Sequence, residues 1–473
     1  MKKSKEQKMA DTISTPVSRK AALFAATLSA FFTPFMASSI NIALPAIARE
    51  FSMNAILLSW IATSYLLAAA MFLVPFGKLA DIYGRKRVFM WGIAIYTIAS
   101  ILTALSSTSL QLIAARVIQG VGGAMIFGTG VAILTSVFPP HQRGRVLGIN
   151  VAAVYSGLSL GPFMGGILTQ HWGWRSIFWI NTGLGIITLL FVLWKLTGEW
   201  AEAKGEKLDL VGSVIYGLML VGLMYGFSRL PSQEAFWLIL FALFGIAFFV
   251  WWELRVDHPV LNLRLFRHNK PLSFSNLAAL INYSATSAVT FLLSLYLQYI
   301  KALSPQQAGV ILVSQPVVMA LLSPVAGKLS DKIEPRIVAS SGMILTVVGL
   351  TLLIFLKQRT PIFIIVLNLV LLGVGFALFS SPNTNAVMSS VEKRYYGVAS
   401  ATLGTMRLVG QMFSMGIATV IFAVVIGKVK ITPDKYPAFL VAARAAFIIF
   451  AVFCFAGIFA SLARGSVRTN KLN

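Results

Sequence analysis

Long apolar segments recur along the whole chain, and they leave few folds open to it. One of them, residues 236–252, reads FWLILFALFGIAFFVWW and contains no charged residue. A run of roughly 18 apolar residues is long enough to cross the hydrocarbon core of a membrane as a helix. The segment also lacks the alternation of apolar and polar residues that a membrane β-strand requires. We therefore predict an all-α integral membrane protein.

The composition agrees with lipid as the solvent. Of the 473 residues, 57% are hydrophobic and only 11% are charged, whereas soluble domains carry about a quarter charged residues. The single cysteine, Cys454, cannot form an intrachain disulfide, and the histidines are too scattered for a metal site. They fall at or near predicted helix ends: His141, His171, His258 and His268. No cofactor is expected.

Fourteen segments fit membrane-spanning helices. They cover about 20–44, 56–77, 88–107, 109–137, 147–170, 176–195, 209–228, 236–253, 273–299, 307–327, 336–356, 361–384, 397–427 and 440–463. The basic N-terminus followed by an apolar stretch could be a signal peptide, but the stretch is long for one, and we interpret it as a retained first helix. An even number of spans puts both termini on the same side of the membrane.

The distribution of basic residues orients the chain. The loops and tails on the side of the termini hold 27 Lys and Arg, the other side holds 10, and two lie inside spans. Cytoplasmic loops of membrane proteins carry such an excess, so we expect both termini in the cytoplasm and the protein in the cytoplasmic (plasma) membrane. The net charge of +24 is then explained by topology, and nucleic-acid binding is not expected.

An internal repeat divides the chain into halves. The segment GKLAD at residues 77–81, after the second span, returns as GKLSD at residues 327–331, after the tenth. Repeated halves are typical of secondary transporters, and they imply that spans 1–6 match spans 9–14. The predicted organisation is a tail (1–19), a six-helix bundle (20–195), a linker with two inserted helices (196–270), a second six-helix bundle (271–464) and a tail (465–473).

Several motifs, in order and on the expected helices, resemble the major facilitator superfamily, and specifically its fourteen-span drug:proton antiporter branch. The matching segments are GKLADIYGRKR (77–87), RVIQGVGGA (116–124), GLSLGPFMGG (157–166), WGWRSIFWIN (172–181) and RLVG (407–410). The resemblance covers nearly the whole chain. It implies two six-helix bundles with two extra helices between them and transport of small molecules by a monomer.

The resemblance also implies functional roles for particular residues, and each role has a purely structural alternative. The loop residues Gly77, Asp81, Gly84 and Arg85, with Gly327 and Asp331 in the repeat, would form a conformational latch, because a carboxylate can pair with a guanidinium and a glycine allows close helix approach. The alternative is a solvated basic loop. The glycines and proline of the fifth span, Gly157, Gly161, Pro162, Gly165 and Gly166, would form a hinge and seal, or else pack statically.

Two arginines inside spans are candidate functional residues, because a charge in the membrane is costly. Arg116 with Gln119, together with Arg407 and Asp81, would serve transport or proton coupling, although Arg116 could instead bond helix carbonyls. We expect a substrate cavity lined by polar and aromatic residues, each of which could also simply pack. The candidates are Ser38, Asn41, Trp60, Tyr65, Tyr155, Asn282, Tyr283, Gln315 and Asn383.

One position departs from the family pattern. The branch begins with an acid five residues before an asparagine, and here Asn41 is preceded at that distance by Met36. With two intramembrane arginines and no acid securely mid-membrane, we expect neutral, zwitterionic or anionic substrates to be favoured over organic cations. Proton coupling would run through Asp81 or the substrate itself, and substrate exchange or facilitated diffusion stays open.

The leading hypothesis is export of small lipophilic molecules, of the multidrug-efflux type, by proton-coupled alternating access. The alternative within transport is a facilitator or exchanger for an organic anion or metabolite. A membrane enzyme would need a motif such as HExxH or GxSxG, and an ATP-driven pump would need GxxxxGK[ST]. The chain contains no HExxH and no GxxxxGK[ST] segment, and the GLSLG of residues 157–161 is already part of the fifth-span motif named above. We therefore predict a secondary transporter and not an enzyme.

Overall fold

The computed structural model describes residues 16–201, 203–257, 259–261, 263–267, 269–391, 396–427, 429 and 431–465. Every regular element in these ranges is helical, and fourteen spans are long and apolar enough to cross a membrane. The predicted fold class is confirmed. Parts of the earlier predictions fall outside the described chain: the tails, His258 and His268, and the side chains of His141 and Asp331.

The first bundle consists of six helices. They are α2 (Pro16–Glu50), α3 (Ala55–Tyr83), α4 (Arg85–Ala104), α5 (Ser109–Val137), α6 (Pro140–Trp172) and α7 (Arg175–Lys195). Helix α2 packs against α5, α6 and α7, and α4 packs against α5 and α7. Several helices are longer than the sequence predicts, since their polar ends continue beyond the apolar segment.

Two inserted helices, α8 (Leu210–Arg229) and α9 (Gln233–Glu253), follow as a hairpin. Helix α8 packs against α3 and α16, and so touches both bundles. Helix α9 exposes large apolar side chains along its length, including Phe236, Phe241 and Phe244. An apolar surface of this kind needs lipid around it.

The second bundle follows the short helix α10 (Arg264–Arg267). Its helices are α11 (Lys270–Leu295), α12 (Pro305–Leu312), α13 (Ser314–Lys332), α14 (Pro335–Ile354), α15 (Ile362–Ser389), α16 (Tyr396–Ile421) and α17 (Tyr436–Ala463). Helices α11 and α16 continue as π-helical turns, η1 (Tyr296–Ile300) and η3 (Phe422–Ile426), and the 3-10 turn η4 (Pro433–Lys435) precedes α17.

The tenth span is broken in two. Helix α12 ends at Leu312 and α13 begins at Ser314. Pro316, in the first turn of α13, has no N–H to donate to the carbonyl of Leu312, and its ring crowds that carbonyl. Pro316, three residues after Val313, therefore interrupts a segment that reads in the sequence as one helix.

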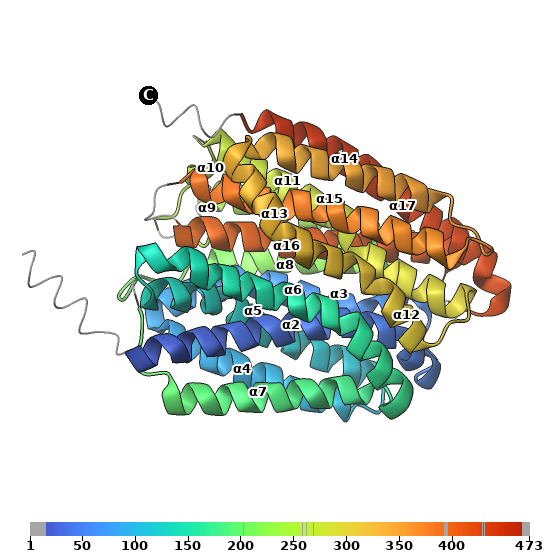
Figure 1. Ribbon diagram of the computed structural model, residues 1–473, viewed down its shortest axis with the longest axis horizontal. Coiled ribbons are helices and arrows are strands. Elements are labelled where there is room, and N and C mark those ends of the chain that lie inside the picture. Colours follow the sequence, from blue (N-terminus) through green and yellow to red (C-terminus); the bar gives the residue numbers. More distant parts are fainter. Residues whose placement is uncertain are drawn as a thin grey trace, which may run out of the picture.

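Figure 1 shows the two bundles side by side, with α2, α4, α5, α6 and α7 in the lower part of the view and α13, α14, α15 and α17 in the upper part. Helix α2 begins and α17 ends at the same end of the bundle, on the left. We call this end the terminal face and the other the opposite face. The bundles meet where α3 packs against α16, α6 against α12 and α13, and α2 against α11.

Candidate functional site

Hydrogen bonds join the two bundles toward the opposite face. The Ser294 hydroxyl of α11 donates to the Asn41 carbonyl of α2 at 2.5 Å, and the Gln298 amide donates to the Ile42 carbonyl at 2.9 Å. Asn41 thus contributes its backbone to a contact between bundles, while its own amide donates to Ala37 within α2 at 3.4 Å.

Backbone contact closes the same region between α6 and α12. The Pro162 carbonyl lies where a side chain on Gly309 would begin, and a Cβ on Gly166 would lie 2.6 Å from the Pro305 carbonyl oxygen. No side chain larger than hydrogen fits at either glycine without a shift of the backbone. We call these α2–α11 and α6–α12 contacts the opposite-face seal.

The other glycines of α6 contact their own bundle. A Cβ on Gly161 would lie 2.6 Å from the Ser38 Cβ, and one on Gly165 would lie 2.8 Å from the Ser39 Cα, both on α2. Gly157 faces α2 in the same way, at the Phe31 carbonyl. Three of the four glycines predicted to form a hinge or seal therefore pack α6 against α2, and Gly166 alone of the four touches the second bundle.

Arg116 lies in a polar network inside the first bundle. Its side chain is 1% exposed, and its Nε donates to the Ile61 carbonyl of α3 at 3.1 Å. A terminal nitrogen donates to Gln119, whose amide donates to Ser100 of α4 at 2.7 Å. The guanidinium also lies 4.5 Å from the ring centroid of Tyr65. Each of these partners belongs to α3, α4 or α5, and one of them is a helix carbonyl, as the alternative interpretation of Arg116 expects.

Arg407 lies in a different environment, on α16 beside Tyr283 of α11, in a group of residues that we call the centre. It is partly exposed on α16, its guanidinium lies 5.2 Å from the ring centroid of Tyr283, and its buried Nε has no hydrogen-bond partner. The Tyr283 ring meets Phe376 edge-on at 5.4 Å. One turn beyond Phe376, the Ser380 hydroxyl lies 3.2 Å from that of Tyr155, which comes from α6 of the first bundle. Both bundles therefore contribute to this centre.

Several predicted cavity residues are engaged elsewhere. The Ser38 hydroxyl donates to the Leu158 carbonyl at 3.1 Å, and the Asn383 amide donates to the Ser275 carbonyl at 3.1 Å. The Asn282 amide faces the Cys454 sulfur at 4.0 Å. Trp60 joins an apolar cluster with residues of α8 and α16, and Gln315 is partly exposed at the start of α13. Of the nine predicted cavity residues, Tyr155 and Tyr283 meet at the centre beside Arg407.

The loop between α3 and α4 lies at the terminal face. The Asp81 carboxylate pairs with Arg85 at 2.7 Å, and Arg85 also donates to the Ser136 hydroxyl of α5. Gly84 has φ +117°, which is accessible to glycine and strained for other residues. A Cβ on Gly77 would meet no atom within 4 Å, whereas one on Gly327 would lie 3.0 Å from the Ser381 hydroxyl oxygen.

The linker that follows α7 binds this loop. The Glu199 carboxylate accepts the Lys86 backbone N–H at 2.8 Å and lies 3.7 Å from Arg87. The Trp200 carbonyl accepts the N–H of Arg85, and the N–H of Ala203 donates to the carbonyl of Asp81, both at 2.9 Å. Lys78 also pairs with Glu206. Sequence reasoning missed this contact, although the glutamates of the linker, opposite a basic loop, were a usable signal.

Met36 occupies the position where the family pattern has an acid, and its surroundings in the structure are apolar too. Met36 is 1% exposed and lies in the main hydrophobic core. Among the acids whose side chains are described, Glu253 is fully buried, but it lies at the end of α9, where it accepts the N–H of Leu261 at 2.9 Å. No described acid pairs with Arg116 or Arg407, so the charge of the central region is positive.

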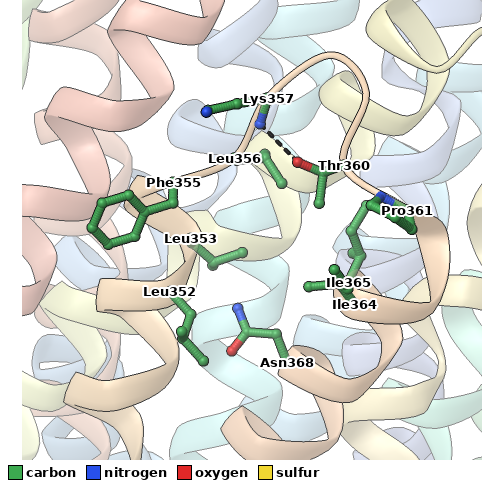
Figure 2. A pocket seen from close by; sticks show the side chains of 10 residues that line it. All are labelled: Leu352, Leu353, Phe355, Leu356, Lys357, Thr360, Pro361, Ile364, Ile365 and Asn368. Atoms are coloured by element: carbon green, nitrogen blue, oxygen red, sulfur yellow. Dashed lines mark hydrogen bonds between the residues drawn. The ribbon is translucent and has the colours of Figure 1, made fainter.

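A cavity of about 340 Å³ lies apart from this centre. Figure 2 shows it under the loop between α14 and α15, where the Lys357 N–H donates to the Thr360 hydroxyl at 2.9 Å. It is lined by Leu352, Leu353, Phe355, Leu356, Lys357, Thr360, Pro361, Ile364, Ile365 and Asn368. Its walls belong to the second bundle alone, and none of the predicted site residues lines it.

Comparison with known proteins identifies the family. The chain is 29% identical over 439 residues to the riboflavin transporter RibZ of Clostridioides difficile, covering 91% of this chain and 94% of that protein. It is 30% identical over 402 residues to the multidrug resistance protein Stp of Mycobacterium tuberculosis, covering 84% of this chain and 74% of that protein. The fold matches the structure of a bacterial homologue of the lysosomal transporter Spinster with a TM-score of 0.69 at 16% identity, covering 95% of this chain and 98% of that one.

The family model of the Major Facilitator Superfamily matches residues 26–254 and 276–472, which together make up most of the chain. The match runs through both bundles and through the inserted helices. It agrees with the fourteen apolar spans and with the transporter relatives, and it confirms the resemblance that the motifs indicate. The chain belongs to the Major Facilitator Superfamily and is a membrane transporter, not an enzyme.

Proposed function

We propose that the protein is a monomeric secondary transporter that exports small lipophilic molecules across the plasma membrane by alternating access, with the terminal face in the cytoplasm. The excess of Lys and Arg on that face supports the orientation. The observation that carries the proposal is the opposite-face seal, which lies beside a centre to which both bundles contribute. In an alternating-access cycle, a site closed on one face is loaded from the other.

The contacts of the opposite-face seal are of a kind that can open and close during such a cycle. The seal consists of backbone contacts at Gly166 and Gly309 and of a few hydrogen bonds, such as that from Ser294 to Asn41. Contacts of this kind depend on short distances, so a small rotation of one bundle against the other breaks them together. A compound entering from the terminal face would then leave from the opposite face, which is the direction of export.

We assign the loop between α3 and α4 as the latch of this cycle. In the present conformation Asp81 is paired with Arg85 inside the first bundle, and the space beside Gly77 is open. When the terminal face closes, an element of the second bundle can approach at Gly77. The repeat, Gly327 and Asp331, would form the corresponding latch on the other bundle, although a Cβ on Gly327 would already lie 3.0 Å from the Ser381 hydroxyl oxygen.

Proton coupling would not use an acid in the first helix. Met36 occupies the position of the usual acid, so the proton would be carried by Asp81 or by the substrate. The network of Arg116, Gln119 and Ser100 would then hold α3, α4 and α5 together during the cycle.

A second function, facilitated diffusion or exchange of an organic anion, is favoured by the same missing acid. A centre with Arg407 and no described carboxylate attracts an anion, and an anion driven by its own gradient needs no proton site. The relatives named for riboflavin and for multidrug resistance are compatible with an organic substrate of either kind.

Transport in proteoliposomes separates the two functions. We would add riboflavin, rhodamine 6G or carboxyfluorescein to the outside of proteoliposomes whose transporters have the terminal face outward, with and without a pH gradient, and measure uptake. Export coupled to protons predicts uptake that the gradient accelerates, and a facilitator predicts uptake that follows the substrate gradient alone. Arg116→Ala should lower transport, whereas Arg444→Gln, on an exposed position of α17, should not. Failure of the wild type to move any compound in a broad panel would contradict the proposed function.

A further inference from the structure

The two arginines inside the membrane differ in how their hydrogen-bond donors are used. Arg116 is 1% exposed and donates to Ile61 and Gln119, both of its own bundle. The guanidinium has five N–H donors in a planar fork, and the first bundle binds one donor on each of two nitrogens, Nε and Nη1. Arg116 is thus enclosed, and a ligand would have to displace protein groups to reach it.

Arg407 has a hydrogen-bond donor that no described protein group accepts. Its Nε is buried and has no partner, and no described carboxylate pairs with it. It lies 11 residues after the start of α16 at Tyr396, about 16 Å along the helix axis at 1.5 Å per residue. Burying a guanidinium at that depth with an unsatisfied donor costs free energy unless another group accepts its hydrogen bond. A ligand anion can supply that group.

The packing around Arg407 holds the guanidinium in position. Gly410, one turn further on α16, faces α11, where a Cβ would lie 2.9 Å from the Tyr283 Cβ and 2.6 Å from the Leu280 carbonyl oxygen. The two helices are therefore in close contact, and Arg407 lies over the Tyr283 ring at 5.2 Å. The Arg407 side chain also hydrogen-bonds Tyr283, so the donor that is open to a third group is the buried Nε.

Aromatic side chains surround the same point. Tyr283 meets Phe376 at 5.4 Å with an interplanar angle of 81°, and Tyr155 and Arg407 both lie near enough to interact electrostatically with Tyr283. Tyr155 and Ser380, 3.2 Å apart, add two hydroxyl groups from opposite bundles. Aromatic rings with a few polar groups suit a planar, largely apolar ligand.

We propose that Arg407, Tyr283, Phe376 and Tyr155 form the substrate site and that it selects planar aromatic compounds that carry an anionic group. The guanidinium binds the carboxylate or phosphate, and the rings hold the aromatic part. This inference rests on the proposed function and deepens it, because it names the class of substrate. Because Tyr155 comes from the first bundle and the other three residues from the second, a ligand here would contact both moving parts.

The test uses two xanthene dyes of opposite charge. Binding of carboxyfluorescein, an anion, and of rhodamine 6G, a cation, is measured by fluorescence polarisation on the purified full-length protein. We expect the wild type to prefer carboxyfluorescein. Arg407→Gln should weaken its binding about tenfold, which corresponds to about 1.4 kcal/mol, with rhodamine 6G unchanged or improved. Arg407→Lys should retain part of the affinity, because it keeps the charge and loses the planar fork.

Controls separate binding from folding and from the proposed function. Arg444→Gln removes a positive charge from an exposed position and should bind both dyes as the wild type does. Size-exclusion profile and melting temperature report whether Arg407→Gln is folded, and Arg407→Lys provides the milder variant at the same position. The inference is overturned if the wild type prefers rhodamine 6G, or if a folded Arg407→Gln binds carboxyfluorescein as well as the wild type. Either result leaves export itself intact, since that is measured independently with the broad transport panel.

Discussion

The Glu199 carboxylate accepts a hydrogen bond from the Lys86 backbone N–H at 2.8 Å. The linker after the first bundle therefore caps the N-terminus of α4, which begins at Arg85. Free N–H groups and the positive end of the helix dipole favour an anion at this point. In the same contact, Ala203 and Trp200 bond the loop backbone, so the linker and the loop form one unit at the terminal face.

Removing this cap should loosen the loop. Glu199→Ala takes away the acceptor for Lys86 and the partner of Arg87, and loss of a helix cap costs about 1 kcal/mol. We expect a lower melting temperature in detergent and faster trypsin cleavage after Lys86 and Arg87. Glu234→Ala, which breaks an exposed pair with Arg229 at 3.4 Å, is the matched control. Equal cleavage rates in the two variants would contradict the role of Glu199.

Gly77 should tolerate alanine in stability but not in transport. A Cβ there meets nothing within 4 Å, and alanine is about 0.5–1 kcal/mol better than glycine in a helix. If the space is filled by another helix when the terminal face closes, Gly77→Ala will keep its melting temperature and lose transport rate in proteoliposomes. Gly183→Ala on α7, whose Cβ also meets nothing within 4 Å, should keep both. Unchanged transport in a folded Gly77→Ala would remove Gly77 from the latch.

Gly161 should be far less tolerant. A Cβ there would lie 2.6 Å from the Ser38 Cβ and 2.9 Å from the Phe35 carbonyl oxygen, so Gly161→Val forces α6 away from α2. Overpacking of this kind costs about 1–3 kcal/mol. We expect a reduced yield of folded protein and a lower melting temperature.

Two further variants check the contact with α2. Gly130→Ala, whose Cβ would be 3.9 Å from its nearest neighbour, Phe89, should behave like the wild type. Ser38→Gly combined with Gly161→Ala should recover part of the loss that Gly161→Ala causes alone, because it removes one of the two clashing groups. Absence of any recovery would show that the backbone of Phe35 alone sets the limit.

The sequence predicts the membrane fold well, because lipid imposes one simple rule on each span. Every spanning backbone must satisfy its own hydrogen bonds, and an apolar run of helical length is therefore sufficient to identify it. Even so, the break at Val313 was missed, since hydropathy does not register the missing N–H of Pro316. The ends of α2 and α6 were missed for the related reason that their outer turns are polar.

The candidate site was harder to predict, because its members depend on which way a helix faces. Three of the predicted cavity residues are polar aromatic or amide side chains inside spans: Tyr65, Asn282 and Tyr283. The structure places Tyr65 against Arg116 and Asn282 against Cys454, away from the centre. Only Tyr283 of these three lies beside Arg407. The sequence places both Arg116 and Arg407 inside spans, but the unused Nε of Arg407 is visible only in three dimensions.

The opposite-face seal leads to the last prediction. The Pro162 carbonyl occupies the place of a side chain on Gly309, so Gly309→Val cannot keep α6 and α12 at their present separation. Neighbouring contacts, including that of Gly166 with Pro305, should open with it. We expect the opposite face to become accessible to water. The measurement is labelling of Gln306→Cys, beside this contact, by a membrane-impermeant maleimide. The background is Cys454→Ala, which removes the single native cysteine of the chain.

Gly309→Val should raise the labelling rate of Gln306→Cys severalfold, while Val310→Ala, at a position 49% exposed on the same helix, should leave it unchanged. A detergent-exchanged sample that keeps its size-exclusion profile shows that the variant is folded. The same variant should lose transport, because a transporter whose opposite face no longer closes cannot return to load its substrate at the terminal face. A folded Gly309→Val that labels slowly and transports normally would mean that the contact between Pro162 and Gly309 does not control opening.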